Sequence, residues 1–177
     1  MADINVSSPG SDEAAVRSAF QAILKNWRVI GASGVAVPLT GSTSETTLAT
    51  VTIPAGAMGA NGIIRVSAQF SCTNNANVKN GRVRLGGLAG TLVNAQTITS
   101  TAGAYTLRAI HNRNSQSSQV VSFGSASANS FTTTTVAALT MTVDTSVAQD
   151  LVFTGQLATG TDTITLESYL VEVLYQA

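Results

Sequence analysis

Few side chains in this sequence could carry out acid–base or nucleophilic chemistry. The chain of 177 residues has one histidine, His111, and one cysteine, Cys72. A lone histidine can act as a general base or a metal ligand, but its neighbours in AIHNRN add no carboxylate, thiol or second imidazole. We interpret His111 as a polar residue at a strand end and Cys72 as a small buried apolar residue. We therefore expect no catalytic residue, no metal site and no cofactor.

The nine acidic residues are dispersed along the chain. Glu167 and Glu172, five residues apart in one strand-like run, are the pair considered as catalytic carboxylates. Side chains alternate between the two faces of a strand, so this spacing predicts that the two carboxylates point to opposite sides. On one strand they cannot then form the carboxylate pair of a glycosidase. Pairs formed by carboxylates distant in sequence are left open.

Three further motifs have a structural and a functional interpretation. The asparagines of NNAN (74–77) could hydrogen-bond a sugar, but asparagine also suits turns, and we favour a corner between strands for CTNNANVKNG. Arg82 and Arg84 share one strand face and could contact an acidic partner, although a solvated sheet face is the usual arrangement. GRVRLGGLAG lacks the order GxGxxG and no helix follows it, so it does not predict a phosphate site.

The composition excludes some classes of partner. Charged residues make up 10% of the chain, nine basic against nine acidic, which argues against a nucleic-acid surface and a polybasic membrane contact. No apolar run approaches the roughly 20 residues of a membrane helix. So little charge suits a protein whose faces are covered by copies of itself or by a larger particle. The start of the chain has no secretory signal pattern, which predicts synthesis in the cytoplasm.

The N-terminal part predicts an extended arm followed by one short amphipathic helix. The helix spans SDEAAVRSAFQAILKNWRVIG (11–31), with a capping Ser11 or Asp12 at its start. Its apolar side chains, spaced i, i+4, i+7 and i+11, form one stripe: Val16, Phe20, Ile23 and Trp27. A single helix cannot bury such a stripe alone. The stripe is our candidate attachment or oligomer interface; packing on the chain's own β domain is the alternative.

From residue 34 onward, short runs of alternating apolar and polar residues are separated by Gly, Asn, Ser and Thr. We predict strands at 35–39, 46–53, 63–71, 81–87, 91–99, 104–112, 118–124, 136–144, 150–157 and 162–175. About eight to ten antiparallel strands predict an all-β sandwich of jelly-roll type. The last run is the longest and should lie centrally in its sheet. We expect two domains, with residues 1–33 for attachment or oligomerisation and residues 34–177 forming the sandwich.

Several phrases resemble the β-rich structural proteins of tailed bacteriophages and related phage-like particles. They are TSETTLATVTIPAGAMGANGIIRVSAQFSCTNNANVKNGRVRLGG, HNRNSQSSQV and GQLATGTDTITLESYLVEVL, and the resemblance covers roughly residues 35–175. Such proteins form head spikes, head fibres, decoration knobs or tail fibres. The resemblance carries no catalytic motif and assigns no individual functional residue.

The resemblance implies a non-enzymatic virion protein, commonly a homotrimer, that attaches to capsid or tail proteins through its N-terminal segment. The short helix favours a compact spike or decoration on the capsid over a long fibre. The virion would be its location after synthesis in the host bacterial cytoplasm. Two alternatives remain: a tail-fibre or tail-tip module that binds a host receptor or surface glycan, and a carbohydrate-binding β-sandwich unrelated to virions.

Overall fold

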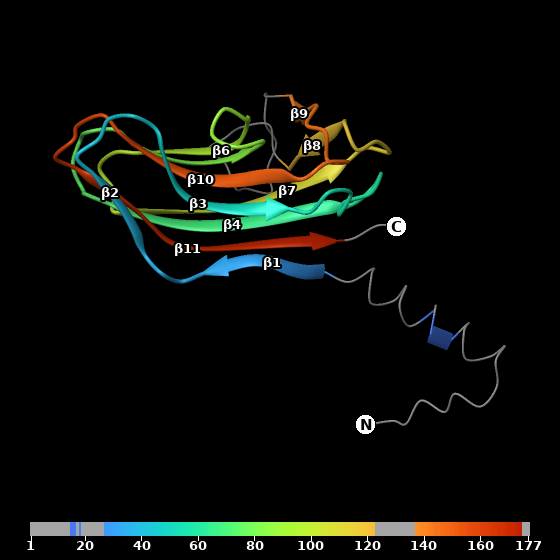
Figure 1. The fold of residues 1–177 in the computed structure, drawn as a ribbon. Helices are drawn as coiled ribbons and strands as arrows, with labels where there is room; N and C mark the ends of the chain where they lie inside the picture. The colour runs from blue at the N-terminus through green and yellow to red at the C-terminus, as the bar shows by residue number, and fades with distance from the viewer. Residues whose placement is uncertain (1–14, 17, 19–26, 123–136, 175–177) are drawn as a thin grey trace, which may run out of the picture.

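The structure of the protein is a computed structural model that describes residues 15–16, 18, 27–122 and 137–174. This part of the chain is built from β-strands joined by turns (Figure 1). The strands are β1 (Trp27–Ser33), β2 (Val37–Thr40), β3 (Thr46–Ile53), β4 (Ile63–Cys72), β5 (Lys79–Leu85), β6 (Thr91–Ile98), β7 (Gly103–Asn112), β8 (Gln119–Val121), β9 (Leu139–Met141), β10 (Gln149–Leu157) and β11 (Thr163–Leu174). None of the helical residues described belongs to a segment long and apolar enough to cross a bilayer.

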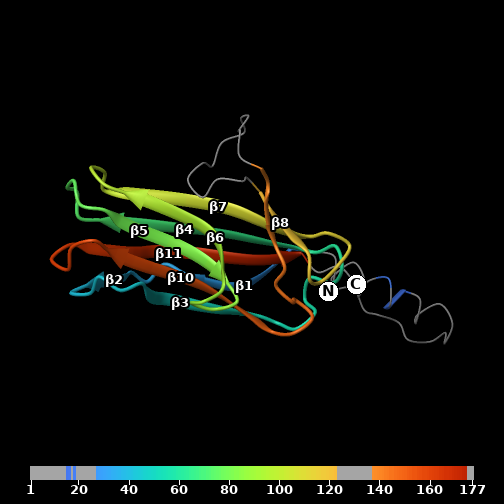
Figure 2. The same ribbon diagram turned by 90° about the horizontal axis from the view of Figure 1, so that it is seen from above.

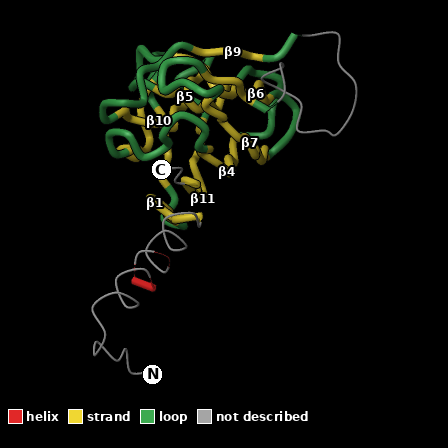
Figure 3. The backbone as a smooth tube through the Cα atoms, turned by 90° about the vertical axis from the view of Figure 1, so that its right-hand side faces the viewer, coloured by secondary structure: helices red, strands yellow, loops and turns green. Residues whose placement is uncertain are grey.

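The strands form two antiparallel sheets that lie face to face (Figures 1 and 2). The larger sheet has the order β1-β11-β4-β7-β8-β9, and β2 also pairs with β11; the smaller sheet has the order β3-β10-β5-β6. In the end view of Figure 3, β1, β11, β4 and β7 follow one another along one side of the molecule. The predicted all-β antiparallel sandwich is confirmed.

The connectivity is that of a long hairpin rolled into two layers. β1 pairs with β11, β3 with β10, β4 with β7, and β5 with β6. The first strand thus pairs with the last, and each pair further along the chain joins strands that are closer in sequence. This nested pairing is that of a jelly roll. The predicted central position of the last strand is also confirmed, because β11 lies between β1 and β4.

The predicted helix is wrong at its C-terminal end. Trp27–Ser33 forms β1, which pairs with β11, so the sandwich begins at Trp27 and not at residue 34. Trp27, Val29 and Gly31 fit a strand as well as a helix, and pairing with the edge of β11 satisfies their backbone groups. Of the earlier part of the helix, Ala15, Val16 and Ser18 are helical and exposed; its other residues, and the arm, lie outside the described ones.

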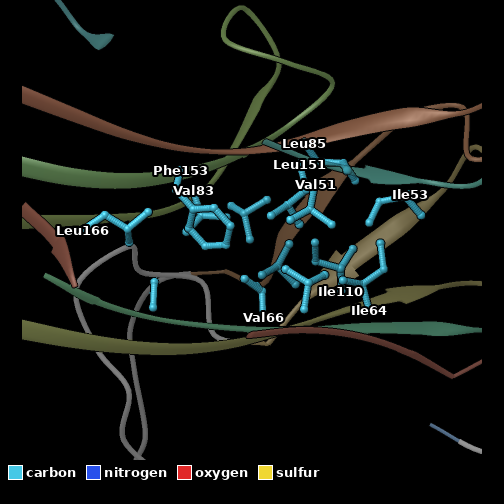
Figure 4. Packing of buried hydrophobic residues seen from close by; sticks show 14 of the residues in the cluster. Val51, Ile53, Ile64, Val66, Val83, Leu85, Ile110, Leu151, Phe153 and Leu166 are labelled. Carbon is cyan, nitrogen blue, oxygen red and sulfur yellow. The ribbon is translucent and has the colours of Figure 1, made fainter. Parts of the chain in front are cut away.

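The core lies between the sheets, where alternate residues of each strand point inward. Figure 4 shows this packing, with Phe153, Val83 and Leu151 of the smaller sheet facing Val66, Ile64 and Ile110 of the larger one. Phe153 also stacks on Tyr169 across the layers, with ring centroids 4.7 Å apart. Burying one such side chain contributes about 1.5–3 kcal/mol.

Two glycines let the sheets approach where Phe70 points into the core. Gly81 of β5 and Gly155 of β10 lie directly opposite each other in the smaller sheet. A Cβ on Gly81 would lie 2.9 Å from the Phe70 ring, and one on Gly155 would lie 2.9 Å from Ile164. Both contacts are closer than real Cβ atoms tolerate. The absent side chains therefore make the space that the larger sheet fills.

We predict that Gly81→Ala lowers the free energy of unfolding by about 1–3 kcal/mol, because the added methyl group overpacks the core against Phe70. Urea denaturation measures this difference. The control is Gly34→Ala, because no atom lies within 4 Å of a Cβ placed there. Equal stability of the two variants would contradict the close contact between the sheets.

Candidate functional site

His111 and Cys72 do not belong to a catalytic cluster in the described part of the chain. His111 lies half-buried on the outer side of β7, opposite Ile63 and Val120. Cys72 ends β4, and its Sγ donates to the Thr101 carbonyl at 3.4 Å. Burial raises the pKa of this thiol, which disfavours the reactive thiolate. Among the described residues, no three His, Cys, Asp or Glu side chains gather where they could hold a metal ion.

The prediction that Glu167 and Glu172 face opposite sides is wrong. A bulge at Glu167 shifts the register of β11 against β4, so the buried residues are even-numbered before it and odd-numbered after it. Both carboxylates consequently lie on the outer face, where Glu167 accepts from Ser71 and Glu172 pairs with Arg65. At about 3.3 Å per residue they are about 13 Å or more apart along the strand, too far to flank one glycosidic bond.

The asparagine-rich stretch is a corner between β4 and β5, as predicted, and it is held by a buried lysine. Lys79 is fully buried, and its Nζ donates to Asn75 Oδ1 at 2.6 Å, to the Asn77 carbonyl at 2.7 Å and to the Asn75 carbonyl at 3.2 Å. All three donors of the ammonium group are therefore used. The amides of Asn75 and Asn77 donate in turn to the two oxygens of Asp162, at 2.7 and 3.0 Å. This network ties the corner to the turn before β11.

The same contacts make the stability depend on pH. The Asn75 amide, helped by Asn77 and Lys79, holds the pKa of Asp162 below its usual value, although burial acts against it. A carboxylate with a lowered pKa in the folded state stabilises the fold above its unfolded pKa, about 3.9. That contribution is lost as the pH falls through the lower, folded pKa.

We predict that Asp162→Asn lowers the denaturation midpoint at pH 7 and flattens its fall below about pH 4, because the variant has no charge at this position to lose. Urea denaturation at a series of pH values measures both effects. The control is Asp150→Asn, since the side chain of exposed Asp150 accepts from Thr52 and the substitution should cost under about 0.5 kcal/mol. An acid dependence unchanged in Asp162→Asn would refute the role of this network.

Arg82 and Arg84 share the outer face of the smaller sheet, as predicted, and both already pair with the carboxylate of Glu45. Glu45 accepts from Arg84 Nε at 2.8 Å and from its Nη2 at 3.0 Å, and Arg82 Nη1 lies 3.0 Å from Glu45 Oε2. Thr154 donates to the same carboxylate at 2.6 Å. The hydrogen bond from Arg84 is the main reason that the pKa of Glu45 is lowered. This cluster fastens the start of β3 to the sheet, and its two arginines and one glutamate leave it with one net positive charge.

In the middle of β7, polar side chains point into the core and apolar side chains point to the solvent, the reverse of the usual arrangement. Thr106 and Arg108 point inward and are buried, whereas Tyr105 and Leu107 point outward and are 59% and 48% exposed. Arg108 donates to Asn94 Oδ1 at 3.0 Å and to the Ser122 carbonyl at 3.2 Å. Because Arg108 finds hydrogen-bond acceptors inside, the apolar side chains of this strand can face the solvent.

These exposed side chains border a hollow of about 210 Å³ on the outer face of the larger sheet, lined by Arg65, Ser67, Tyr105, Leu107, Leu170 and Glu172. Pairing of β11, β4 and β7 places Leu170, Ser67 and Leu107 in one row across the sheet. Ser67 is the smallest of the three and lies between the two leucines, so it forms the floor. We call this feature the sheet hollow. Sequence reasoning missed it, because the row exists only once the register of three strands is fixed.

A charged pair closes one end of the sheet hollow. Arg65 Nε donates to Glu172 Oε2 at 2.7 Å, and Arg65 Nη2 lies 2.6 Å from the same oxygen. The Arg65 guanidinium packs on the Trp27 ring, with its central carbon 4.5 Å from the ring centroid. This is a cation–π contact. Trp27 and Val29 of β1 continue the outer face beyond this pair, 37% and 58% exposed. The hollow thus combines apolar side chains with one hydrogen-bonding charged pair.

Of the four candidate interface residues, the structure describes two, Val16 and Trp27. Trp27 lies on the outer face of β1, and Val16 is half-exposed in a helical segment. Phe20 and Ile23 lie outside the described residues, so the predicted stripe as a unit stays a prediction. Trp27 does not continue a helical stripe, because it belongs to a strand.

Comparisons with known proteins do not place the chain in a family. No family model matches it and no curated protein matches it. Among solved structures, the CBM2 module of the evolved Dit of Lactobacillus casei phage J-1 is 15% identical, covers 72% of this chain and 70% of its own, and has a TM-score of 0.38. The VP2 subviral particle of infectious bursal disease virus is 10% identical over 85% of this chain and 32% of its own, with a TM-score of 0.39. Winged bean acidic lectin, in complex with methyl-α-D-galactose, is 12% identical. The match covers 86% of this chain and 93% of the lectin chain, with a TM-score of 0.37. Likenesses this distant carry no argument about function.

Proposed function

We propose that the protein is a non-enzymatic structural component of a tailed-phage particle, a spike, fibre or decoration attached to the capsid through its N-terminal segment. The resemblance of residues 35–175 to such proteins motivates the proposal. The observation that carries it is the outer side of β1, where Trp27 and Val29 stay exposed at the edge of a well-packed sandwich. Exposed apolar side chains that lie next to each other typically mark a contact with another macromolecule.

The position of β1 supports attachment through the N-terminal end. β1 is the edge strand of the larger sheet and follows directly from residues 1–26. Exposed Trp27 and Val29 therefore stand where the sandwich joins the proposed attachment segment. A partner that binds this segment would also reach the outer side of β1.

We also propose that the protein catalyses no reaction. In the described part of the chain, the ionisable clusters act as structural ties: Lys79 with Asp162 joins two turns, and Glu45 joins Arg82 and Arg84. A tail-fibre or tail-tip module that binds a host receptor is the alternative within the same class. Carbohydrate binding is the second candidate, favoured by the sheet hollow with its exposed tyrosine.

We predict that the full-length protein is a homotrimer, because closed symmetry would cover apolar surface that one chain leaves exposed. Sedimentation equilibrium at micromolar concentration should give three times the chain mass of 18.1 kDa. If the N-terminal segment organises the trimer, a chain lacking residues 1–26 should sediment as a monomer. A stable full-length monomer would contradict this prediction.

We predict that deletion of residues 1–26 leaves a folded sandwich that no longer joins the particle. The deletion must stop before Trp27, since removing residues 1–33 would strip β1 from the edge of β11 and destabilise the sheet. Circular dichroism and urea denaturation test folding, and quantification of the protein on purified particles tests attachment. Normal occupancy of the truncated protein would place the anchor in the sandwich itself.

A further inference from the structure

The geometry points to the sheet hollow as a binding site for one neutral pyranose ring. We propose that the ring lies with its apolar face on Tyr105, Leu107 and Leu170 and that its vicinal hydroxyl groups bind Arg65 and Glu172. This inference names the ligand of the second candidate function and rests on the sheet remaining accessible in the assembled protein. It requires only binding and no reaction.

The size of the sheet hollow selects a single ring. Leu170 and Leu107 are two strands apart, so their backbones are separated by about 10 Å, and the rows of Arg65 and Tyr105 lie about 7 Å to either side of Ser67. The volume of about 210 Å³ is smaller than the roughly 300–1,000 Å³ of pockets that hold drug-sized ligands. One monosaccharide unit fits such a space, and a longer glycan would continue over the open sheet.

The charges select an uncharged ligand. Arg65 and Glu172 form one ion pair with no net charge, and both printed contacts use the same carboxylate oxygen, Oε2. Nη1 of Arg65 therefore keeps donor capacity and Oε1 of Glu172 keeps acceptor capacity beside each other. Two neighbouring hydroxyl groups, each able to donate and accept, match this arrangement. An anion would be repelled by Glu172 and a cation by Arg65.

The Trp27 ring holds the charged pair in place. It lies 4.5 Å from the Arg65 guanidinium, which also donates through Nε to the Glu172 carboxylate. Two partners restrict the side chain before a ligand arrives, so less conformational entropy is lost on binding. Tyr105 at the other end is 59% exposed, and its ring offers apolar contact area with few rotatable bonds.

The test is an NMR titration of the full-length protein with methyl pyranosides of glucose, galactose, mannose and N-acetylglucosamine. We expect at least one to bind in the millimolar range, with amide shift changes confined to β4, β7 and β11. Glucuronate and glucosamine, the charged comparators, should bind at least about tenfold more weakly. Shift changes elsewhere, or none with any neutral sugar, would overturn the proposal.

Variants on the outer face separate binding from folding. Ser67→Leu should abolish binding by filling the floor, whereas Ser67→Ala should retain it. Leu107→Ala and Glu172→Gln should each weaken binding by about tenfold, equivalent to 1.4 kcal/mol. The matched control is Leu88→Ala, which removes a leucine of similar exposure, 46%, from the turn between β5 and β6. If Ser67→Leu binds like the unmodified protein, the site is wrong.

One further measurement distinguishes this inference from the proposed function. Ser67→Leu should still join particles at normal occupancy, because it leaves the N-terminal segment unchanged. Normal occupancy together with no sugar binding in the unmodified protein would overturn the sugar site alone. Loss of occupancy in Ser67→Leu would instead show that the sheet hollow contacts another protein chain, which also overturns the sugar site.

Discussion

The close approach of the two sheets around Phe70 is the constraint on which the rest of the structure depends. The ring of Phe70 occupies space that Gly81 leaves open, and Ile164 occupies space that the opposing Gly155 leaves open. Protein interiors are packed to crystal-like density, so a side chain added here must displace a neighbour. Because these contacts join β4 to β5 and β11 to β10, they fix how one layer sits on the other.

Packing also determines which side chains are left for function. The smaller sheet turns threonine and arginine outward, and Glu45 ties Arg82 and Arg84 together. The larger sheet turns Tyr105 and Leu107 outward instead. This difference arises because the inward side chain of Arg108 donates to Asn94 and to the Ser122 carbonyl. Only one face of β7 points into the core, so the side chains on its other face point to the solvent. Burial of this polar side chain thereby accompanies exposure of the apolar side chains that border the sheet hollow.

Much of the fold could be predicted from the sequence. The run 46–53 coincides with β3, and the runs assigned to β4, β7, β10 and β11 agree within one or two residues. Alternation of apolar and polar residues identifies a strand, but assigning each residue to a face assumes that the period of two never changes along it. The bulge at Glu167 breaks that period and brings Glu172 to the same face. At Trp27 the apolar spacing fitted a helix as well as a strand, and only pairing with β11 decides between them.

The sheet hollow shows a different limit of sequence reasoning. Its residues come from three strands that are distant along the chain, and none of them forms a motif with its sequence neighbours. Ser67 becomes a floor only because the register places Leu170 on one side of it and Leu107 on the other. Arg65 and Glu172 meet across the same pairing, 107 positions apart. A shift of one residue in that pairing would turn these side chains into the core. The bulge that defeats the simple prediction for Glu172 is therefore also what places its carboxylate beside Arg65, at the edge of the hollow.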